Sequence, residues 1–253
     1  MKTLLHTIRK IIIRALIVFF VVTIGITILY RFVPVPITPL MVQRYIEQDN
    51  AQLKKNWVPL TAMSPDMPLA VIASEDQLFM QHYGFDVKAI QKALDYNKKK
   101  NGKKIKGAST ISQQTAKNVF LWQGRTWLRK GLEVYFTALI ELLWSKDRII
   151  EVYLNVIEMG RGVYGADAAA EYYFNKNAKQ LNAAECASIA AILPNPIKWS
   201  ARKRTAYIDK RKNWTLKQMR YLREGITDQL FTEEEPEEEP EEEPEEEIKT
   251  SKK

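Results

Sequence analysis

The sequence predicts a mainly α-helical protein in three parts: a membrane-spanning helix at the N-terminus, one helical domain and an acidic tail. Residues 11–30 are almost entirely apolar, and residues 233–247 consist of glutamate and proline. Between them, apolar side chains recur every three or four positions, which is typical of helices that bury one face. The predicted parts are a cytoplasmic N-terminus at 1–10, a transmembrane signal anchor at 11–31, a periplasmic domain at 32–228 and a disordered acidic tail at 229–253.

The N-terminal apolar run has the length and composition of a transmembrane helix. It contains 16 apolar side chains in 20 residues and one charge, Arg14. Twenty helical residues span about 30 Å, which is the thickness of the hydrocarbon core of a bilayer. Lys2, Arg9 and Lys10 precede the run and place the N-terminus in the cytoplasm. Because no small-residue cleavage site follows, we expect an uncleaved anchor that crosses the inner membrane once, with the rest of the chain in the periplasm.

The segments after the anchor have the pattern of amphipathic helices. A proline-rich stretch at 34–39 predicts an extended exit from the membrane. Within residues 149–156, for example, four apolar side chains line one helical face, whereas strand-like alternation is scarce throughout. The aromatic stretch at 120–127 fits either the core or the membrane surface. Helices are predicted at residues 67–81, 86–99, 110–119, 127–144, 146–156, 166–174, 183–193 and 205–224.

The formal net charge of +8 is an average over parts of opposite sign. The tail holds 12 of the 30 acidic residues, which leaves 18 acidic against 35 basic residues in 1–232, a net charge of +17. Repulsion between its glutamates, together with its prolines, predicts a disordered and solvated tail. The alternative is a tail that folds back electrostatically onto the basic body. Residues 32–232 alone carry about +12. Such a domain is expected to bind a polyanion, a phosphate or diphosphate group, or an anionic membrane surface.

Cysteine and histidine usage excludes several classes of site. The only cysteine, Cys186, lies among alanines on a predicted helix, so we expect a buried thiol and no intrachain disulfide. With two histidines, His6 and His82, neither a His/Cys zinc site nor a serine triad that uses histidine is expected. The sequence also lacks the glycine-rich phosphate loops of nucleotide-binding proteins.

The first candidate catalytic residue is Glu75, which follows the apolar segment LAVIAS. On a helix that continues to residue 81, Glu75, Phe79 and His82 would share one face, and Gly84 would end the helix in a left-handed conformation. A carboxylate at the edge of the core loses water, which raises its pKa towards the range of a general base. His82 is expected to pack or to form a hydrogen bond. On this segment alone, an ordinary surface acid is an equally good interpretation of Glu75.

The second cluster is the segment GASTISQQTAKN at residues 107–118. Thr110 and Gln113 form a capping-box pattern at the start of a helix. The free N–H groups of this turn, together with the side chains of Ser109 and Thr110, are expected to face an anion at the positive end of the helix. Gln113 and Lys117 are four residues apart and are expected to project together. The segment therefore predicts a polar wall for a ligand.

The third cluster contains Arg125, Arg129, Lys130 and Glu133. A salt bridge between Arg129 and Glu133, worth about 0.3–0.5 kcal/mol, would account for that pair. However, Glu133 interrupts an otherwise apolar helix and stands beside several cations, which is typical of a functional site. Two carboxylates accompanied by Lys117 and these cations suit glycosyl transfer from a diphosphate leaving group. One carboxylate would deprotonate a sugar hydroxyl while the cations stabilise the departing diphosphate.

Five segments stand in the order and at the spacing of the motifs of one enzyme family: EDQLFMQHYGFD, GASTISQQTAKN, RKGLE, KDRIIEVYLN and AAECASIAAILPNP. Over residues 34–221 the chain resembles the peptidoglycan glycosyltransferases of glycosyltransferase family 51, in particular the monofunctional biosynthetic transglycosylases of Gram-negative bacteria. The resemblance implies a lysozyme-like, mainly α fold with a membrane-facing hydrophobic region. It also implies polymerisation of lipid II into β-1,4-linked glycan strands, with inversion and release of undecaprenyl diphosphate.

The resemblance implies a role for each candidate residue. Glu75 would be the general base that deprotonates the 4-hydroxyl of the acceptor N-acetylglucosamine. Glu133 would assist at the diphosphate, directly or through a divalent cation, Mg²⁺ or Mn²⁺, whose ligands the sequence does not define. Lys117 and Arg125 would bind and neutralise the diphosphate. The residues expected to line the same cleft are Ser109, Thr110, Gln113, Gln114, Asn118, Arg129 and Lys130. Structural roles are expected for Glu151, Tyr153 and Asn155.

The implied partners are lipid II, the growing glycan chain and the inner membrane. Other cell-wall synthesis and division proteins are candidate partners, and no nucleic acid is expected. Two other functions explain part of the pattern. A muramidase that cleaves glycan would use two carboxylates, but its neutral leaving group needs no cations such as Lys117 and Arg125. A non-catalytic, membrane-anchored binder of anionic wall polymer would explain the charge, but not the two carboxylates.

Overall fold

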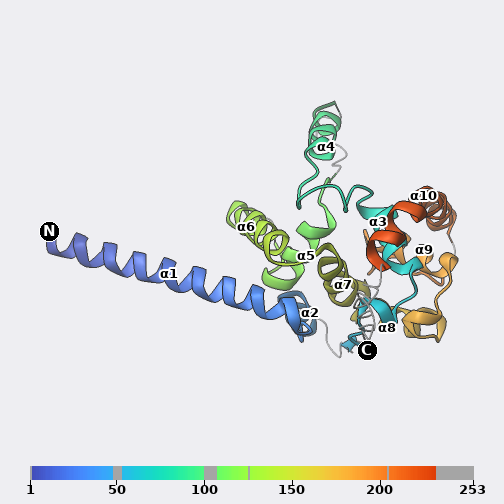
Figure 1. The fold of residues 1–253 in the computed structure, drawn as a ribbon, viewed down its shortest axis with the longest axis horizontal. Helices are drawn as coiled ribbons and strands as arrows, with labels where there is room; N and C mark the ends of the chain where they lie inside the picture. Colours follow the sequence, from blue (N-terminus) through green and yellow to red (C-terminus); the bar gives the residue numbers. More distant parts are fainter. Residues whose placement is uncertain (1, 48–52, 100–106, 125, 204, 232–253) are drawn as a thin grey trace, which may run out of the picture.

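The body is mainly α-helical, as the sequence predicts (Figure 1). The computed structural model describes residues 2–47, 53–99, 107–124, 126–203 and 205–231. Its α-helices are α1 Lys2–Phe32, α2 Pro39–Glu47, α3 Asp66–Glu75, α4 Val87–Lys99, α5 Ile111–Phe120, α6 Trp127–Leu143, α7 Lys146–Val156, α8 Ala166–Phe174, α9 Ala183–Ile192 and α10 Ala206–Phe231. Short 3-10 helices are η1 Leu60–Ala62 and η2 Ala178–Gln180. The predicted site residue Arg125 and tail residues 232–253 lie outside the described residues.

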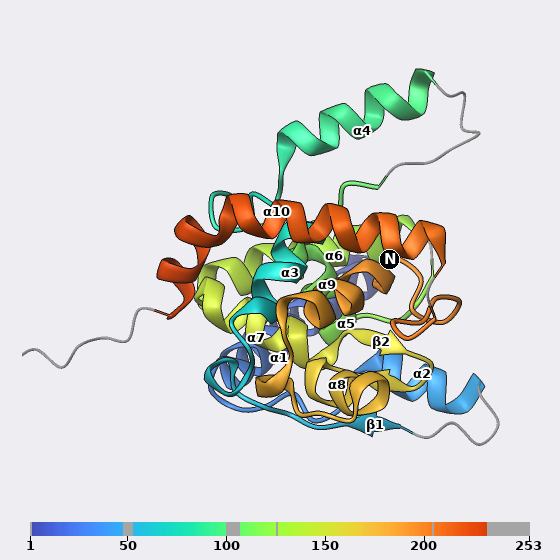
Figure 2. The same ribbon diagram turned by 90° about the vertical axis from the view of Figure 1, so that its right-hand side faces the viewer.

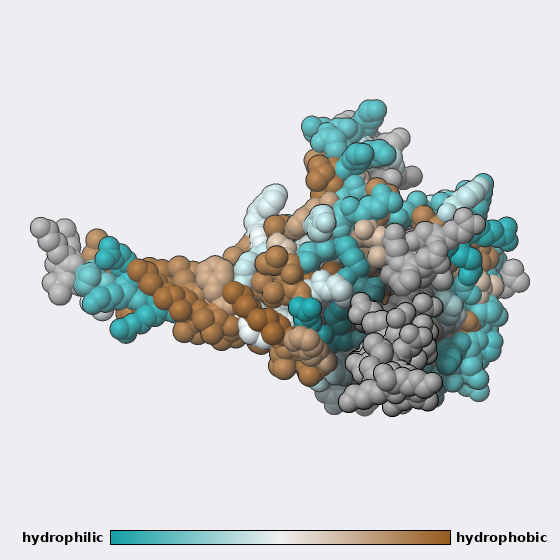
Figure 3. Space-filling view, viewed as in Figure 1, coloured by the Kyte–Doolittle hydropathy of each residue, from teal (hydrophilic) through white to brown (hydrophobic). Residues whose placement is uncertain are grey.

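The helix α1 extends away from the body, as expected for a membrane anchor (Figure 1). Leu4–Phe32 is long and apolar enough to cross a membrane, and beyond its hydrophilic N-terminal end its surface is mostly hydrophobic (Figure 3). Its C-terminal half packs against α6 and the residue after it. The hydroxyl groups of Thr23 and Tyr135 are 2.8 Å apart, and Trp144 Nε1 donates to the Thr27 carbonyl oxygen at 2.8 Å. Side-chain contacts, and not only the chain itself, therefore join the anchor to the domain.

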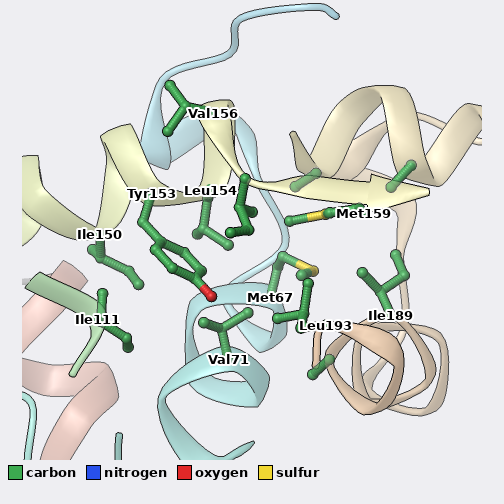
Figure 4. Close-up of a cluster of buried hydrophobic side chains, with 14 of the residues drawn as sticks. Met67, Val71, Ile111, Ile150, Tyr153, Leu154, Val156, Met159, Ile189 and Leu193 are labelled. Carbon is green, nitrogen blue, oxygen red and sulfur yellow. The ribbon is translucent and has the colours of Figure 1, made fainter. Parts of the chain in front are cut away.

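Two groups of helices form the core of the body (Figure 2). The helices α3, α9 and α10 pack against one another, while α5 packs against both α6 and α7. Because α9 and α10 enclose it, α3 is buried continuously from Met67 to Ala73. Figure 4 shows the fully buried Tyr153 of α7 beside Ile111 of α5 and Val71 of α3, where the two groups meet. The helix α4 projects from this body (Figure 2).

A three-stranded sheet lies beside α8. Its strands are β1 Lys54–Lys55, β2 Glu158–Gly160 and β3 Val163–Tyr164, in the order β1-β3-β2. The strand β1 runs parallel to β3, with Lys54 opposite Val163, and β2 is antiparallel to β3. The sequence did not predict these strands, because two or three residues are too few to show an alternating pattern.

The predicted extent of the first helix of the domain is wrong. The helix α3 ends at Glu75 and not at residue 81, because Asp76 leaves helical geometry and its carboxylate accepts a hydrogen bond from the N–H of Ile111 at 2.9 Å. Phe79 and His82 therefore do not continue the helical face of Glu75. Gly84 has the expected left-handed φ of +82°, but it lies in the connection to α4 and caps no helix.

Two other boundaries also differ from the prediction. Pro39 begins α2 and so shortens the extended segment after the anchor, because the first turn of a helix tolerates proline. At the other end, α10 continues to Phe231, three residues into the predicted disordered tail. The sequence contains no proline between Pro196 and Pro236, so nothing in the backbone forces an earlier end.

Gly165, directly before α8, is a position where the backbone requires glycine. Its φ is +86°, and a Cβ atom there would lie 2.9 Å from the carbonyl oxygen of Asn155. We expect Gly165→Ala to lower the free energy of unfolding by about 2 kcal/mol or more, because backbone strain and the collision add. Urea unfolding of the detergent-solubilised protein measures this change.

The matched control is Gly131→Ala. Gly131 lies in α6, and a Cβ atom there would meet no atom within 4 Å. Alanine is expected to raise stability at this helical position by about 0.5–1 kcal/mol. Similar stabilities for the two variants would contradict the requirement for glycine at Gly165.

Candidate active site

The candidate site is a cleft of about 930 Å³ with Glu75 on its wall. Glu75 is the last residue of α3, and the other walls come from the turn before α5, the start of α4 and one face of α10. Of the predicted site residues, the cleft brings together Glu75, Ser109, Thr110 and Gln114. A second group, on α5 and α6, consists of Lys117, Arg129, Lys130 and Glu133.

Contacts from α5 and α10 orient the Glu75 carboxylate. Gln114 Nε2 donates to Glu75 Oε2 at 3.2 Å, while Gln114 Oε1 accepts from the hydroxyl of the buried Tyr153 at 3.3 Å. Arg211 Nη2 is 4.0 Å from Glu75 Oε1. The carboxylate is thus held between an amide and a cation, and 14% of the Glu75 side chain stays exposed.

The surroundings of Glu75 favour its protonated form more than water does. Burial raises the pKa of the carboxyl group above its ordinary value, and the nearby charge of Asp76 acts in the same direction. The hydrogen bond from Gln114 and the charges of Arg211 and Lys117 lower the pKa, but they do not cancel the effect of burial. A carboxylate with a raised pKa and some remaining access is suited to accept a proton near neutral pH.

The N-terminus of α5 is closed by its own cap and by Asp76. Thr110 and Gln113 form the predicted capping box, with the Thr110 N–H donating to Gln113 Oε1 at 3.1 Å and the Gln113 N–H donating to Thr110 Oγ1 at 3.2 Å. The Thr110 hydroxyl also donates to the carbonyl oxygen of Gly84 at 2.6 Å, and Asp76 accepts from the Ile111 N–H. These bonds occupy the N–H groups of Thr110, Ile111 and Gln113, while Ser109 and Thr110 line the cleft. Binding of an anion at this turn stays a prediction.

Glu133 lies on α6 among cations, as the sequence predicts. Its buried carboxylate is 3.3 Å from Arg129 Nη1 through Oε2 and 2.5 Å from Lys130 Nζ through Oε1. The Glu133 carbonyl oxygen accepts from the hydroxyl of Thr137 at 2.6 Å. Glu133 therefore forms ion pairs with two cations, and not only the single salt bridge with Arg129 that the spacing of four residues would explain. An anion that arrived here would compete with Glu133 for both cations.

Lys117 interacts electrostatically with both candidate carboxylates. Burial lowers the pKa of its ammonium group, whereas the charge of Glu133 and, less strongly, that of Glu75 raises it. At the next position, Asn118 is buried and its Nδ2 atom lacks a hydrogen-bond partner among the described residues. An unpaired buried donor is energetically costly. Lys117 thus links Glu75 in the cleft electrostatically with the cation group on α6.

Sequence reasoning missed the residues of α10 that line the cleft, namely Tyr207, Arg211 and Trp214. No local pattern marks them, because aromatic and basic side chains on a helix are equally typical of a solvated face. It also missed Asp76, although the residue stands beside Glu75. Only the contact between Asp76 and α5 distinguishes it from an ordinary surface acid.

Several predicted packing roles are confirmed. His82 forms a hydrogen bond with a buried carboxylate, and Cys186 is a buried, free thiol. The aromatic stretch before α6 belongs only in part to the core. Leu121 is buried in the core, whereas Trp122 and Trp127 are exposed. Hydrogen bonds within the body also agree with the structural roles expected for Glu151, Tyr153 and Asn155.

Residues 42–220, from within α2 to within α10, match the family described as transglycosylase. The chain belongs to the transglycosylase family. Among its relatives are proteins named biosynthetic peptidoglycan transglycosylase. That of Pseudomonas entomophila strain L48 is 51% identical over 213 residues, which are 83% of this chain and 89% of the relative. That of Bacteroides thetaiotaomicron is 55% identical over 208 residues, which are 81% of this chain and 83% of the relative. That of Haemophilus influenzae is 51% identical over 211 residues, which are 81% of this chain and 85% of the relative.

Membership of the transglycosylase family confirms the resemblance carried by the five sequence segments, and with it the lysozyme-like, mainly α fold. Both the cleft around Glu75 and the cation group around Glu133 lie inside the matched range. The anchor α1 and residues 221–253 lie outside it.

Burial of Glu75 is expected to cost stability. The pKa of its carboxyl group is higher in the folded chain than in the unfolded chain. Between these two pKa values the unfolded state releases the proton more readily, so the free energy of unfolding falls as the pH rises. We expect Glu75→Gln to be more stable than the parent chain at pH 7 and to lose this advantage towards pH 4. Unfolding measured across this pH range tests the expectation.

The matched control is Glu171→Gln, at an exposed glutamate of α8. Equal pH profiles of stability for Glu75→Gln and Glu171→Gln would contradict the expected cost of burying Glu75.

Proposed function

We propose that the chain is a peptidoglycan glycosyltransferase of cell-wall synthesis that polymerises lipid II into β-1,4-linked glycan strands. The observation that carries the proposal is the placement of Glu75 as a desolvated carboxylate on the wall of a cleft, in electrostatic contact with Lys117. Lys117 in turn interacts with the cation group around Glu133. Family membership and the names of the relatives support the same activity.

In the proposed reaction, Glu75 is the general base. It takes the proton of the 4-hydroxyl of the acceptor N-acetylglucosamine, and the oxygen forms a bond to C1 of the donor N-acetylmuramic acid. The bond between C1 and the diphosphate oxygen breaks on the opposite face, which gives inversion, and undecaprenyl diphosphate leaves with the electron pair. Gln114 holds Glu75 in place through its hydrogen bond, while Arg211 and Lys117 stabilise the ionised form that must be present before the proton is taken.

The cation group supplies the charge that the leaving diphosphate requires. Arg129 and Lys130 already bind one carboxylate, and Lys117 is half-buried beside them. Preorganised cations in a partly desolvated site stabilise developing negative charge more strongly than water does. We infer that Glu133 keeps these cations in position and yields them to the diphosphate when the donor binds.

We further propose that a divalent cation, Mg²⁺ or Mn²⁺, takes part in the diphosphate site. The described part of the chain contains no group of three ligating side chains. Such an ion is commonly bound through one or two carboxylates and the phosphates of the substrate, so Glu133 would be its protein ligand. When bound, the ion would add positive charge at the diphosphate.

We propose that α1 crosses the inner membrane once, with the domain in the periplasm. The basic residues before the apolar run support this orientation. Apolar side chains of α6, which packs against α1, remain open: Trp127 is 92% exposed, Leu128 70% and Leu142 80%. A lipid-linked substrate in the membrane would therefore meet the side of the domain that carries the cation group.

Purified full-length protein in detergent, given labelled lipid II with Mg²⁺ or Mn²⁺, tests the proposed activity. We expect a polymer that lysozyme digests. Glu75→Gln is expected to lose at least about 100-fold in rate because the general base is gone, and Glu133→Gln is expected to be strongly impaired because the cations lose their partner. Glu171→Gln, on α8, is the control for loss of a carboxylate elsewhere.

Two outcomes of this assay would contradict the proposal. Normal polymerisation by Glu75→Gln would exclude Glu75 as the base. Intact lipid II together with cleavage of preformed glycan would favour a muramidase. The pH dependence of the parent enzyme is a further check: its rate should fall as the pH drops through the raised pKa of Glu75, since a protonated carboxyl group cannot accept the proton.

A further inference from the structure

An exposed row of aromatic and basic side chains runs along α10, starting in the cleft. Its members, which we call the α10 row, are Tyr207, Lys210, Trp214, Lys217 and Tyr221. They follow one another at spacings of three and four residues and therefore share one face of the helix. Tyr207 and Trp214 line the catalytic cleft, and Tyr221 lies about two turns beyond Trp214. The row thus continues the proposed active site along the surface of the body.

The aromatic rings of the row lie outside the buried core, and in the part of the chain that the structure describes only the Tyr207 ring contacts a residue packed against it, Trp199, at a centroid distance of 5.1 Å. Tyr207 is 52% exposed, Trp214 46% and Tyr221 71%, whereas buried residues such as Ile208 and Met219 make the core contacts of α10 from another face. Aromatic side chains provide large contact areas at binding surfaces, and several of them exposed on one face indicate such a surface.

The lysines of the row add positive charge between the rings. Both Lys210 and Lys217 are exposed, and within the described residues their ammonium groups have no carboxylate partner. Lys217 Nζ lies 6.0 Å from the centroid of the Tyr221 ring. The row therefore combines flat apolar faces with cations that are free to bind carboxylates of a ligand.

The spacing of the rings matches that of a β-1,4-linked glycan. Tyr207, Trp214 and Tyr221 are seven residues apart, which is about 10.5 Å per step along a helix. One disaccharide unit of an extended β-1,4 chain has nearly this length. Pyranose rings present C–H groups that pack against aromatic faces, and the stem peptides of peptidoglycan carry carboxylates for the lysines.

The place of α10 in the fold indicates which strand would use the row. In Figure 1, α10 lies at the end of the body farthest from the free end of α1, whereas α6, with Glu133, packs against α1. A donor whose diphosphate is held near Glu133 has its sugar C1 towards Glu75. The earlier sugars of the growing strand must then leave the cleft away from the diphosphate.

We propose that the α10 row is the track along which the growing glycan strand leaves the cleft. Each aromatic ring would contact one disaccharide unit, and Lys210 and Lys217 would bind stem-peptide carboxylates. This inference rests on the proposed function, and it adds a binding surface that only a strand longer than the first units can reach. Its contribution should therefore grow with the length of the glycan.

Binding to preformed glycan tests the track without catalysis. The protein is full-length Glu75→Gln in detergent, and the probe is soluble, uncrosslinked strands of about four or more disaccharide units with their stem peptides, long enough to pass all three rings. Adding Tyr221→Ala or Lys217→Ala is expected to raise the Kd by about threefold to tenfold, measured by calorimetry. A single disaccharide–peptide should bind equally to all variants, because it does not reach Tyr221.

Tyr172→Ala is the matched control. Tyr172 is an exposed tyrosine of α8, 45% exposed, with Lys54 Nζ 5.5 Å from its ring centroid, so it resembles the pair of Lys217 and Tyr221 outside the row. It should leave the Kd for long strands unchanged. Removal of the stem peptides should abolish the effect of Lys217→Ala and preserve that of Tyr221→Ala. Equal Kd values for Tyr221→Ala and the parent on long strands would overturn the track.

Polymerisation separates this inference from the proposed function. With Glu75 intact and lipid II as substrate, Tyr221→Ala is expected to make shorter strands than Tyr172→Ala, as resolved by gel electrophoresis. If the parent chain makes no polymer at all, the proposed function fails, and the binding experiment still decides whether the row holds glycan. If the parent polymerises and Tyr221→Ala makes strands of the same length, the track is wrong.

Discussion

The buried carboxylate of Asp76 is the contact on which the arrangement of the cleft depends. It accepts the N–H of Ile111 at the start of α5 and lies 2.9 Å from His82 Nε2, so one side chain joins three segments. Because Asp76 turns towards α5, α3 ends at Glu75, and Gln114 on α5 comes within hydrogen-bond distance of the Glu75 carboxylate. A buried charge is costly unless it is paired and hydrogen-bonded, and the two partners of Asp76 offset that cost.

The second organising element is α6, which takes part in the core, the anchor contact and the cation group at once. Phe136 and Ile140 are buried in the core, Tyr135 reaches Thr23 of α1, and Glu133 binds its two cations one turn earlier. The helix α6 therefore connects the cations around Glu133 with the apolar helix α1. The cleft around Glu75 lies on the side of α3 and α10, so the proposed glycan track along α10 would lead a strand away from α1.

Much of the excess positive charge of the body has a structural partner. The Arg148 guanidinium donates to the carbonyl oxygens of Tyr30 and Val33 at the end of α1, and Lys146 donates to His82 O at 2.6 Å and to Glu141 at 2.8 Å. These cations hold the anchor and the connecting segment in place. The charge that composition alone assigns to an anionic partner is therefore divided between internal contacts, the group around Glu133 and the exposed lysines of α10.

The sequence by itself determined the features that depend on neighbouring residues: a helix long and apolar enough to cross a membrane, most helix boundaries, the capping box of Thr110 and Gln113, and the choice of Glu75 and Glu133 as candidate carboxylates. Helical periodicity and capping are local, so a single chain segment encodes them. Tertiary structure alone decided that α3 stops at Glu75, that Asp76 accepts the N–H of Ile111 at the start of α5, and that α10 supplies Arg211 and Trp214 to the cleft. Each of these depends on a contact between segments far apart in the chain, and no local pattern of side chains records which distant segment will become a neighbour.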